Sequence, residues 1–561
     1  MKKYNLFKVL AITIFITWLL TLFIPGSYVD YTGEVATTGI TGVGIWGLLS
    51  NLSISISYFN AIAVFLIALA CFYAVLNKVD VYNTFVSKTA SLFKGKEKAL
   101  VIITMLVFGI LALLVNDFLI LLVFVPFIYK VMKELDIDKK IILSSTLVAA
   151  LIGSMCGIYN STLFTAFGLD LNTLLLVKLI LFVISIAVLM ILTAPKKEVK
   201  KAVVKKTTSK AVKKTTKEEV KEKPVKKVTT KDKKVRKSVY AILTLLLGTI
   251  GVNKFYAGKV KAGILSILFC WTGIPTILSI AEFITVLTEK ADKKGMISVT
   301  SERRRNVSFG VALVLFVLFI IGAIIPWESL IENCSVFSDF NTWLAGIKIG
   351  DYSIFGNIIG LPLSVDQTTG STTGVISVFG TWSITDIAIL LFVLTALFAV
   401  INGIKVNDFI ATVTEGTKKI LPVALTAMLL SIVLVMAVTT GISVTITNGI
   451  LKLADGFNIA TATLATIIGS VLTSDFYYLI STVGTVFNVV VSNQEYYGVI
   501  SLILQSVYNL VMIIAPTSVG LVIGLYYLNI PYNKWFKFIW KLLVALLIIV
   551  IITSIIVYAL V

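Results

Sequence analysis

The sequence predicts an all-α integral membrane protein with about 11 spanning helices and two re-entrant hairpins, arranged as an inverted-repeat secondary-transporter architecture. Its mean hydropathy is +0.98, and 58% of its 561 residues are apolar while 14% are charged, which lies far outside the range of soluble globular proteins. The apolar residues fall in many runs of roughly twenty, the length of a helix that crosses a bilayer. No residue is histidine, which excludes His-liganded metal, Ser-His-Asp triads and HExxH sites. We therefore expect no enzyme.

The lysines and arginines of the loops predict the orientation of the spans. Residues 26–57 contain neither residue type and are expected outside, whereas 78–98 contain five lysines and are expected in the cytoplasm. The resulting path places the N-terminus inside and, after a last span at 542–560, the C-terminus outside. We expect a multi-pass protein of the cell membrane.

Two apolar blocks have the charge flanks of hairpins rather than of single spans. Block 99–129 has lysines on both sides and block 462–490 has none on either side. Each is too short for two full spans and carries a polar group at its middle, Asn116-Asp117 in one and Thr473-Ser474-Asp475 in the other. Non-helical backbone at membrane depth survives only beside protein or a water-filled cavity, so each hairpin tip is a candidate site.

Two further spans are predicted to be broken helices. Span 141–169 is interrupted at 153–162, a segment that contains Asn160, Ser161 and Thr162. Span 499–527 is interrupted at 515–520, which contains Thr517 and Ser518. Half-helices that end at such points present free N–H and C=O groups, the first suited to carboxylates and the second to sodium.

The order of elements repeats along the chain. Asp117 and Asp475 are 358 residues apart, and Asn160 and Thr517 are 357 apart. An extra span at 307–325 makes the first hairpin open inward and the second outward. Inverted repeats with discontinuous helices are typical of secondary transporters, whose substrates and coupling ions bind at the midplane.

We expect oxygen-bearing side chains from both halves to form the substrate or ion site. They are Asn116, Asp117, Asn160, Ser161, Thr162, Thr473, Ser474, Asp475, Thr517 and Ser518. Sodium is a candidate ion at Asn116 and Asp117 and at Ser474 and Asp475. An ionisable group at membrane depth is costly and usually faces a cavity or a partner. The sequence places no lysine or arginine near the middle of either half. The alternative for the aspartates is helix capping, and for Ser and Thr it is hydrogen bonding to freed backbone.

The net charge of +20 is concentrated in one segment. Residues 196–237 hold 19 basic and five acidic residues and so carry 14 of the 20 charges. With few apolar groups, 195–236 is predicted to be a disordered cytoplasmic linker. Two roles are open for this linker: it could bind anionic lipid, or it could be a solvated spacer. Nucleic-acid binding is not expected because aromatic residues are absent from it.

Several motifs resemble the anaerobic C4-dicarboxylate carrier family of the ion transporter superfamily, in particular its YfcC-like branch, often described as basic amino acid antiporters. The resemblance covers roughly 1–194 and 307–561 and rests on LFIPGSY, FKGKEKALVIITMLVFGILALL, FGTWSITDIAILL and APTSVGLVIGLYYLNIPYNKWFKFIW. The family's paired-glutamate hairpin tip is replaced here by Val115-Asn116-Asp117. The resemblance implies the transporter fold without specifying the substrate.

Residues 237–288 resemble a second family, the two-helix transmembrane hairpin called the TM-two domain. The motif is LLLGTIGVNKFYAGKVKAGILSILFCWTGIPTILSIAEFI, with Asn253 at the family's usual histidine and Glu282 at its usual late aspartate. For Glu282, pairing with a cation, an interface role and a helix-end position are all open. The predicted organisation is a first transporter repeat at 1–194, the linker at 195–236, the TM-two domain at 237–288, a basic loop at 289–306 and a second repeat at 307–561.

The hypothesis is a carrier that moves a small organic ion by alternating access. The ion is an amino acid, including a basic one, or a C4-dicarboxylate, coupled to sodium, a proton or counter-substrate, with no further cofactor. The rival is a non-transporting membrane scaffold or sensor that recruits a partner through the central hairpin. It stays open because both hairpin tips, Val115-Asn116-Asp117 and Thr473-Ser474-Asp475, depart from the pattern of the family. The oligomeric state is left open.

Overall fold

The computed structural model describes residues 4–193, 234–270, 274–299, 302–350, 352–353, 363–365, 372–374 and 377–561. Internal contacts divide the chain into two units, Met1–Ala194 with Leu318–Val561 as the first and Pro195–Val317 as the second. The predicted lysine-rich linker lies outside the described residues except for 234–236.

The described residues are predominantly helical, which confirms the predicted all-α membrane protein. Within them, six helices are long and apolar enough to cross a bilayer. They contain Leu6–Phe23, Phe59–Leu76, Glu97–Leu114, Leu175–Thr193, Val406–Thr439 and Tyr532–Leu560. Shorter apolar helices accompany them, and three of these, Ile459–Leu472, Phe476–Val490 and Val519–Leu528, come from spans that are interrupted by polar residues.

The first part of the chain contributes helices and one β-hairpin to the first unit. These elements are α1 (Tyr4–Phe23), β1 (Gly26–Val29), β2 (Val35–Gly39), α2 (Ile45–Leu76), α3 (Asp80–Leu92), α4 (Glu97–Leu114), the 3-10 helix η1 (Phe118–Phe124), α5 (Val125–Glu134), α6 (Lys139–Leu143), the π-helix η2 (Ser144–Val148), α7 (Ala149–Met155), α8 (Ser161–Phe167) and α9 (Leu175–Thr193).

The second part begins with α14, whose last residues belong to the same unit. Its elements are α14 (Glu302–Ile324), α15 (Trp327–Leu330), α16 (Val336–Gly346), β5 (Lys348–Ile349), β6 (Tyr352–Ser353), β7 (Leu363–Val365), β8 (Thr372–Gly374), α18 (Ile384–Ile401), α19 (Val406–Thr439), α20 (Ile442–Leu451), α21 (Ile459–Leu472), α22 (Phe476–Leu479), the π-helix η4 (Ile480–Gly484), α23 (Thr485–Val490), η5 (Gln494–Tyr496), α24 (Tyr497–Met512), α25 (Val519–Leu528) and α26 (Tyr532–Leu560).

Helices α2 and α19 form the longest packed pair of the first unit. They approach closely at Gly416, where an added Cβ would lie 2.9 Å from the carbonyl oxygen of Ala70. The β1–β2 hairpin packs on the turn that follows α19, because Ser27 N–H donates to the Gly441 carbonyl at 3.2 Å. Gly441 has a φ of +72°, a conformation that a side chain would strain.

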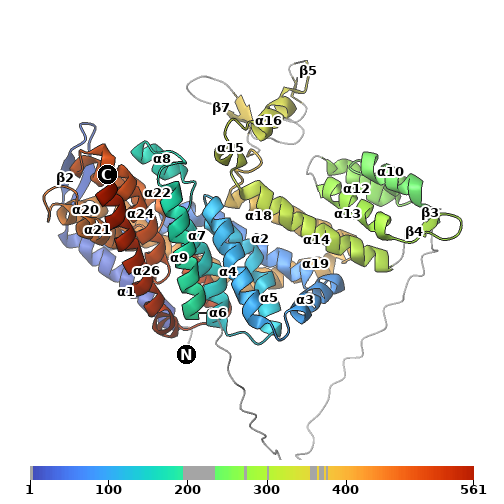
Figure 1. Cartoon of the computed structure of the whole chain (residues 1–561), viewed down its shortest axis with the longest axis horizontal. Helices are drawn as coiled ribbons and strands as arrows, with labels where there is room; N and C mark the ends of the chain where they lie inside the picture. The colour runs from blue at the N-terminus through green and yellow to red at the C-terminus, as the bar shows by residue number, and fades with distance from the viewer. Residues whose placement is uncertain are drawn as a thin grey trace, which may run out of the picture. The chain divides into compact units, whose positions relative to one another are not determined.

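The two halves of the unit repeat one packing pattern. In the first half α7 packs against α4 and α9, and in the second α24 packs against α21 and α26. Helices α4, α7 and α9 run side by side in Figure 1, as do α24 and α26. Because α7 also packs on α24, the two interrupted spans lie at the centre, where the halves meet.

The second unit contains α10 (Lys237–Leu247), α11 (Val252–Tyr256), α12 (Val260–Leu268) and α13 (Ile274–Thr288). Strands β3 (Lys234–Arg236) and β4 (Met296–Ser298) pair antiparallel and join the two ends of this helical group. A buried cluster that includes Tyr240, Ala257 and Val286 forms its core.

Glu282 on α13 is the polar centre of the second unit and is only 6% exposed. It forms an ion pair with Lys254 and accepts hydrogen bonds from the Tyr240 hydroxyl at 2.6 Å and from Asn253 Nδ2 at 3.1 Å. Of the three roles left open for Glu282, pairing with a cation is therefore confirmed. The network ties α10, α11 and α13 together.

Candidate functional site

Four interruptions divide apolar helices of the first unit, and a polar side chain caps the helix that follows each one. Asp117 accepts from Leu119 N–H at 2.8 Å and Asp475 accepts from Tyr478 N–H at 3.3 Å. The other two caps are Asn160, which accepts from Leu163 N–H at 3.1 Å, and Ser518, which accepts from Leu521 N–H at 3.4 Å. The capping role considered for both aspartates is thus confirmed, and each carboxylate lies at a positive helix end.

Within each half, the hairpin interruption and the broken-span interruption are joined by a hydrogen bond at the equivalent place. In the first half Ile158 N–H donates to the Leu113 carbonyl at 3.1 Å. In the second half Thr517 Oγ1 donates to the Val471 carbonyl at 3.1 Å. Leu113 and Val471 each precede the capping aspartate by four residues, so the two acceptors are at equivalent places, although one donor is a backbone N–H and the other a hydroxyl.

Helix α24 connects the interruptions of the two halves. Gln505 Nε2 donates to the carbonyls of Ser154 and Gly157, both at 3.0 Å, in the first broken span. One turn further along, the Tyr508 hydroxyl donates to the Ser474 carbonyl at 2.9 Å.

The second broken span lies between the hairpin tips that carry Asp117 and Asp475, because Thr517 contacts Val471 and Gly520 lies against Leu119. A contact across the halves explains their proximity, because an added Cβ at Gly520 would lie 3.4 Å from Leu119 and 3.6 Å from Phe118. The start of α25 therefore lies beside the start of η1. The structure thus brings the two predicted aspartates into one region, together with Ser474.

The predicted hydroxyl groups divide into two classes. Thr473 Oγ1 donates to the Gly469 carbonyl of its own helix at 2.7 Å, and the Thr517 and Ser518 hydroxyls make the bonds described above. These three hydroxyls form hydrogen bonds with backbone groups at the interruptions, as the alternative role for Ser and Thr predicted. Ser474 Oγ is buried and has no hydrogen-bond partner among the described residues.

The remaining predicted residues lie at the edges of this region. Asn116 is exposed, whereas Ser161 and Thr162 are half-buried in the first turn of α8. Helix α8 contacts η4 of the second half, and Asn488 Nδ2 donates to the Ala166 carbonyl at 3.1 Å. The first turn of α8 therefore lies on the same side of the bundle as the second hairpin.

The prediction that no basic residue lies near the middle of either half is wrong. Lys178, in the first turn of α9, is 3% exposed, and its Nζ donates to the Gly157 carbonyl at 3.2 Å. In the sequence this lysine stands alone in an apolar run. The fold places it against the interruption that follows α7.

Gln505, Tyr508 and Asn509 are further residues that the sequence did not predict. Gln505 Oε1 and Asn509 Oδ1 are buried without a hydrogen-bond partner in the described part of the chain. Each side-chain amide is oriented by the bonds that its NH2 group donates. Gln505 Nε2 donates to the carbonyls given above, and Asn509 Nδ2 donates to the backbone carbonyl of Gln505 at 2.9 Å. The sequence feature that could have predicted them is the pair of amide side chains one helical turn apart in an apolar span.

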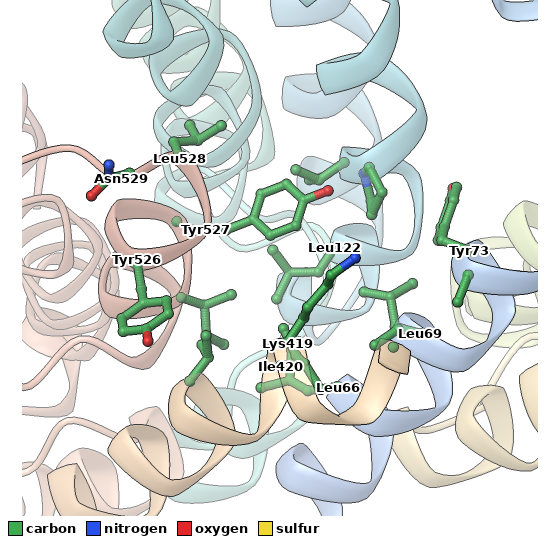
Figure 2. A pocket seen from close by; sticks show the side chains of 18 of the residues that line it. Leu66, Leu69, Tyr73, Leu122, Lys419, Ile420, Tyr526, Tyr527, Leu528 and Asn529 are labelled. Atoms are coloured by element: carbon green, nitrogen blue, oxygen red, sulfur yellow. The ribbon is translucent and has the colours of Figure 1, made fainter. Parts of the chain in front are cut away.

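A cavity of about 570 Å³ opens beside this region. Its walls come from α2, α19, η1, α5, α6, η2 and α25, and the side chains of Tyr73, Leu122, Lys419 and Tyr527 can be followed in Figure 2. Gly520 and Leu147 belong to its wall, and an added Cβ at Gly520 would lie 3.0 Å from Leu147. The cavity therefore reaches the start of α25, two residues from Ser518, although no predicted site residue lines it.

Comparisons with known proteins separate the chain into two regions. Residues 286–559 match the family model of the C4-dicarboxylate anaerobic carrier, and residues 233–284 match that of the TM2 domain. The second region is similar to the uncharacterized membrane protein YozV of Bacillus subtilis (strain 168), with 54% identity over 54 residues, which are 10% of this chain and 68% of that protein. No solved structure matches the chain.

Both matches agree with the resemblances found in the sequence. The first places a transporter family on α18 to α26, which include the second hairpin and the second broken span. The second covers α10 to α12 and most of α13. The chain is thus a multi-pass membrane protein in which a TM2 domain at 233–284 precedes a region, at 286–559, that is similar to the C4-dicarboxylate anaerobic carrier family.

Proposed function

We propose that the protein is a secondary carrier that moves a small organic anion of the C4-dicarboxylate class across the cell membrane by alternating access. The observation that carries the proposal is that α24 contacts interrupted helices of both halves, and that a hydrogen bond joins the two interruptions within each half. Discontinuous helices that meet between two repeats are the typical setting of a transporter site. The family match over the second repeat supports a carrier of dicarboxylates.

The helix ends favour carboxylate as the group that is bound. The N–H groups of a first helical turn lack intrahelical partners, and each cap satisfies one of them. Four such ends, at η1, α8, α22 and α25, supply further N–H groups to one region. A substrate with two carboxylates can use ends from both halves at once, whereas a basic amino acid would place its cationic side chain against the same positive helix ends.

The driving gradient is sodium, a proton or a counter-substrate. Asp117 and Asp475 supply carboxylate oxygen, and Ser474 Oγ is buried with no hydrogen-bond partner within the described segments. Hard cations such as sodium bind oxygen ligands of this kind. Sodium at Asn116 and Asp117, or at Ser474 and Asp475, is our proposal for a coupling site.

The cavity supplies the access path. Its polar lining residues include Asn77, Lys78, Glu415, Lys419 and Asn529, which the loop charges place on the cytoplasmic side. In this orientation the structure is a state open toward the cytoplasm, and Lys78 and Lys419 attract an anion to its mouth. The proposed topology keeps the N-terminus inside and the C-terminus outside.

The proposed organisation is two transporter repeats, 1–194 and 307–561, that are separated by inserted segments. These are the linker at 195–236, a TM2 hairpin at 237–288 and a basic loop at 289–306. Lysines close to the bilayer surface attract anionic lipid by about 1 kcal/mol each, which is the proposed role of the linker.

A thermal-shift screen of the purified full-length protein tests the substrate class. Succinate, fumarate and malate should raise the Tm by roughly 2 °C or more at saturating concentration, since a ligand that binds only the folded state stabilises it. Arginine, lysine and monocarboxylates such as acetate should not. A shift with basic amino acids alone would replace dicarboxylate by amino acid as the substrate, and repetition with sodium and with choline identifies sodium-linked binding.

A further inference from the structure

Lys178 is a cation buried within an apolar helix. Helix α9 has 19 residues, of which most of the others are apolar, and Lys178 is 3% exposed. A buried lysine in an apolar span is costly unless its ammonium faces a partner or water. The Gly157 carbonyl, 3.2 Å from Nζ, shows what the ammonium faces.

The partner of this ammonium is the negative end of a helix. Residues 139–155 form one helical run made of α6, η2 and α7, and Gly157 follows its C-terminus. The last carbonyls of a helix lack intrahelical partners and carry a partial negative charge. Gln505 Nε2 also donates to the carbonyls of Ser154 and Gly157, so these oxygens already converge on donors from two other helices.

The second half has the same contact with a neutral donor. Trp535, 357 residues after Lys178, lies in the first turn of α26 as Lys178 lies in that of α9. Its Nε1 donates to the Ile513 carbonyl at 3.0 Å, and the Tyr532 hydroxyl donates to the Ile514 carbonyl at 2.5 Å. Ile514 stands 357 residues after Gly157. The repeat therefore places a donor on the broken span in both halves, but only the Lys178 contact carries a positive charge.

We propose that the Lys178 ammonium is a tethered cation, which occupies at the first broken span the place that a mobile coupling cation takes at such carbonyls in other transporters. The role of this ammonium in ion coupling rests on the proposed transport function. Of the two proposed sodium sites, a tethered cation in the first half selects the one at Ser474 and Asp475 in the second half, where Ser474 Oγ and Asn509 Oδ1 are buried without partners among the described residues.

Three variants separate charge from hydrogen bonding. Lys178→Arg keeps the cation, Lys178→Gln keeps an N–H donor without charge, and Lys178→Ala removes the group. Lys452→Met removes an exposed lysine that follows α20 and is the matched control. The Tm of each full-length protein is measured in choline chloride, in sodium chloride and in n-propylammonium chloride, whose cation is the part of lysine that alanine lacks.

We expect Lys178→Arg and Lys452→Met to behave as the parent protein in all three salts. Lys178→Ala and Lys178→Gln should have a lower Tm in choline. n-Propylammonium should raise the Tm of Lys178→Ala by roughly 2 °C or more relative to its effect on the parent, because binding to the folded state is stabilising. Sodium should also stabilise Lys178→Ala more than it stabilises the parent.

Two results would overturn the proposal. One is a Lys178→Gln protein that matches the parent in every salt, because a neutral donor would then suffice as it does at Trp535. The other is a Lys178→Ala protein whose Tm responds to n-propylammonium and sodium no more than that of the parent. If Lys178→Ala does not fold, the comparison of Gln with Arg decides.

Transport supplies the coupling readout. In proteoliposomes, the ratio of uptake in sodium to uptake in choline should be several-fold larger for Lys178→Gln than for the parent, since a mobile ion now has to occupy the position. Equal ratios, or a raised KM with no ion dependence, would contradict the coupling role and make Lys178 a scaffold or substrate contact. The Tm measurements need no substrate, so failure of the tethered cation and failure of the transport function are told apart.

Discussion

At the scale of single residues, the capping carboxylates have two separable properties. Asp117 and Asp475 each accept a backbone N–H through one oxygen, and each carboxyl group can also carry a negative charge. Asparagine caps a helix about as well as aspartate but carries no charge. Substitution by asparagine therefore removes the charge while keeping the cap.

We predict that Asp117→Asn and Asp475→Asn each reduce dicarboxylate uptake by roughly tenfold or more, because a charged group at this depth is retained for an ion or a substrate. The Tm of both variants should stay close to that of the parent. Alanine at the same positions should in addition destabilise the protein by about 1 kcal/mol through loss of the cap. Uptake that is unchanged in both asparagine variants would remove the aspartates from the proposed site.

In the second unit, the Glu282 network predicts a stability effect instead. Removing one partner of a buried ion pair lowers the free energy of unfolding by about 3–5 kcal/mol. Because the Lys254 side chain is 22% exposed, we expect a loss near the lower figure. Glu282→Ala should lower the Tm clearly, and the double variant Lys254→Met with Glu282→Leu should recover part of the loss. The matched control is Lys234→Ala, which breaks the exposed pair with Asp292 and should cost at most about 1 kcal/mol. Equal effects of the two single variants would contradict the account.

At the scale of helices, close packing holds the interrupted spans in place. An added Cβ at Gly153 of α7 would collide with the Gly109 carbonyl of α4 and lie 2.9 Å from Ala112. Backbone cannot move aside as a flexible side chain can, so the two helices would have to separate. That separation would displace the carbonyls that contact Gln505.

Gly153→Ala should therefore lower the Tm by several degrees and reduce transport, since overpacking typically costs about 1–3 kcal/mol. Gly449 in α20 is the matched control, because an added Cβ there meets no atom within 4 Å. Gly449→Ala should be neutral or slightly stabilising, as alanine favours helix. Thermal unfolding of the two variants side by side checks the prediction, and a neutral Gly153→Ala would show that α4 and α7 are not tightly packed.

The interruptions could be predicted from the sequence because a polar group inside an apolar run is a local signal. Helices end at Leu114 and Leu472, directly before the segments that contain Asp117 and Asp475. The start of helix α19, at Val406, is harder to predict than its apolar part. Its first turns carry charges such as the Glu415–Lys419 pair, which hydropathy excludes although they stabilise a helix.

The polar groups at the centre could be predicted only in part. Aspartates at hairpin tips were found because charge at membrane depth is conspicuous in a sequence. Lys178, Gln505 and Tyr508 were not, because their role depends on which face of a helix meets another helix far away in the chain. Such pairings follow from tertiary packing and leave no local pattern.

At the scale of the whole carrier unit, alternating access requires that the cavity be open on one side of the membrane. Ala74 of α2 lines it, whereas Thr38 is exposed on β2, which the topology places outside. In a background with Cys270→Ser and Cys334→Ser, a membrane-impermeant thiol reagent should label Ala74→Cys from the cytoplasmic side only and Thr38→Cys from the outside only. Succinate should change the labelling rate of Ala74→Cys and leave that of Thr38→Cys unchanged. Labelling of both positions from one side would contradict the proposed topology.

The central claim is that this protein transports a dicarboxylate through the region where its interrupted helices meet. Uptake of labelled succinate into proteoliposomes tests it most directly, with an inward sodium gradient, a proton gradient or unlabelled succinate inside. We predict accumulation well above that of protein-free liposomes under at least one of these conditions, and its loss in Asp117→Asn with Asp475→Asn. Absence of accumulation under all three conditions, in a preparation whose Tm responds to succinate, would contradict transport and favour a membrane sensor.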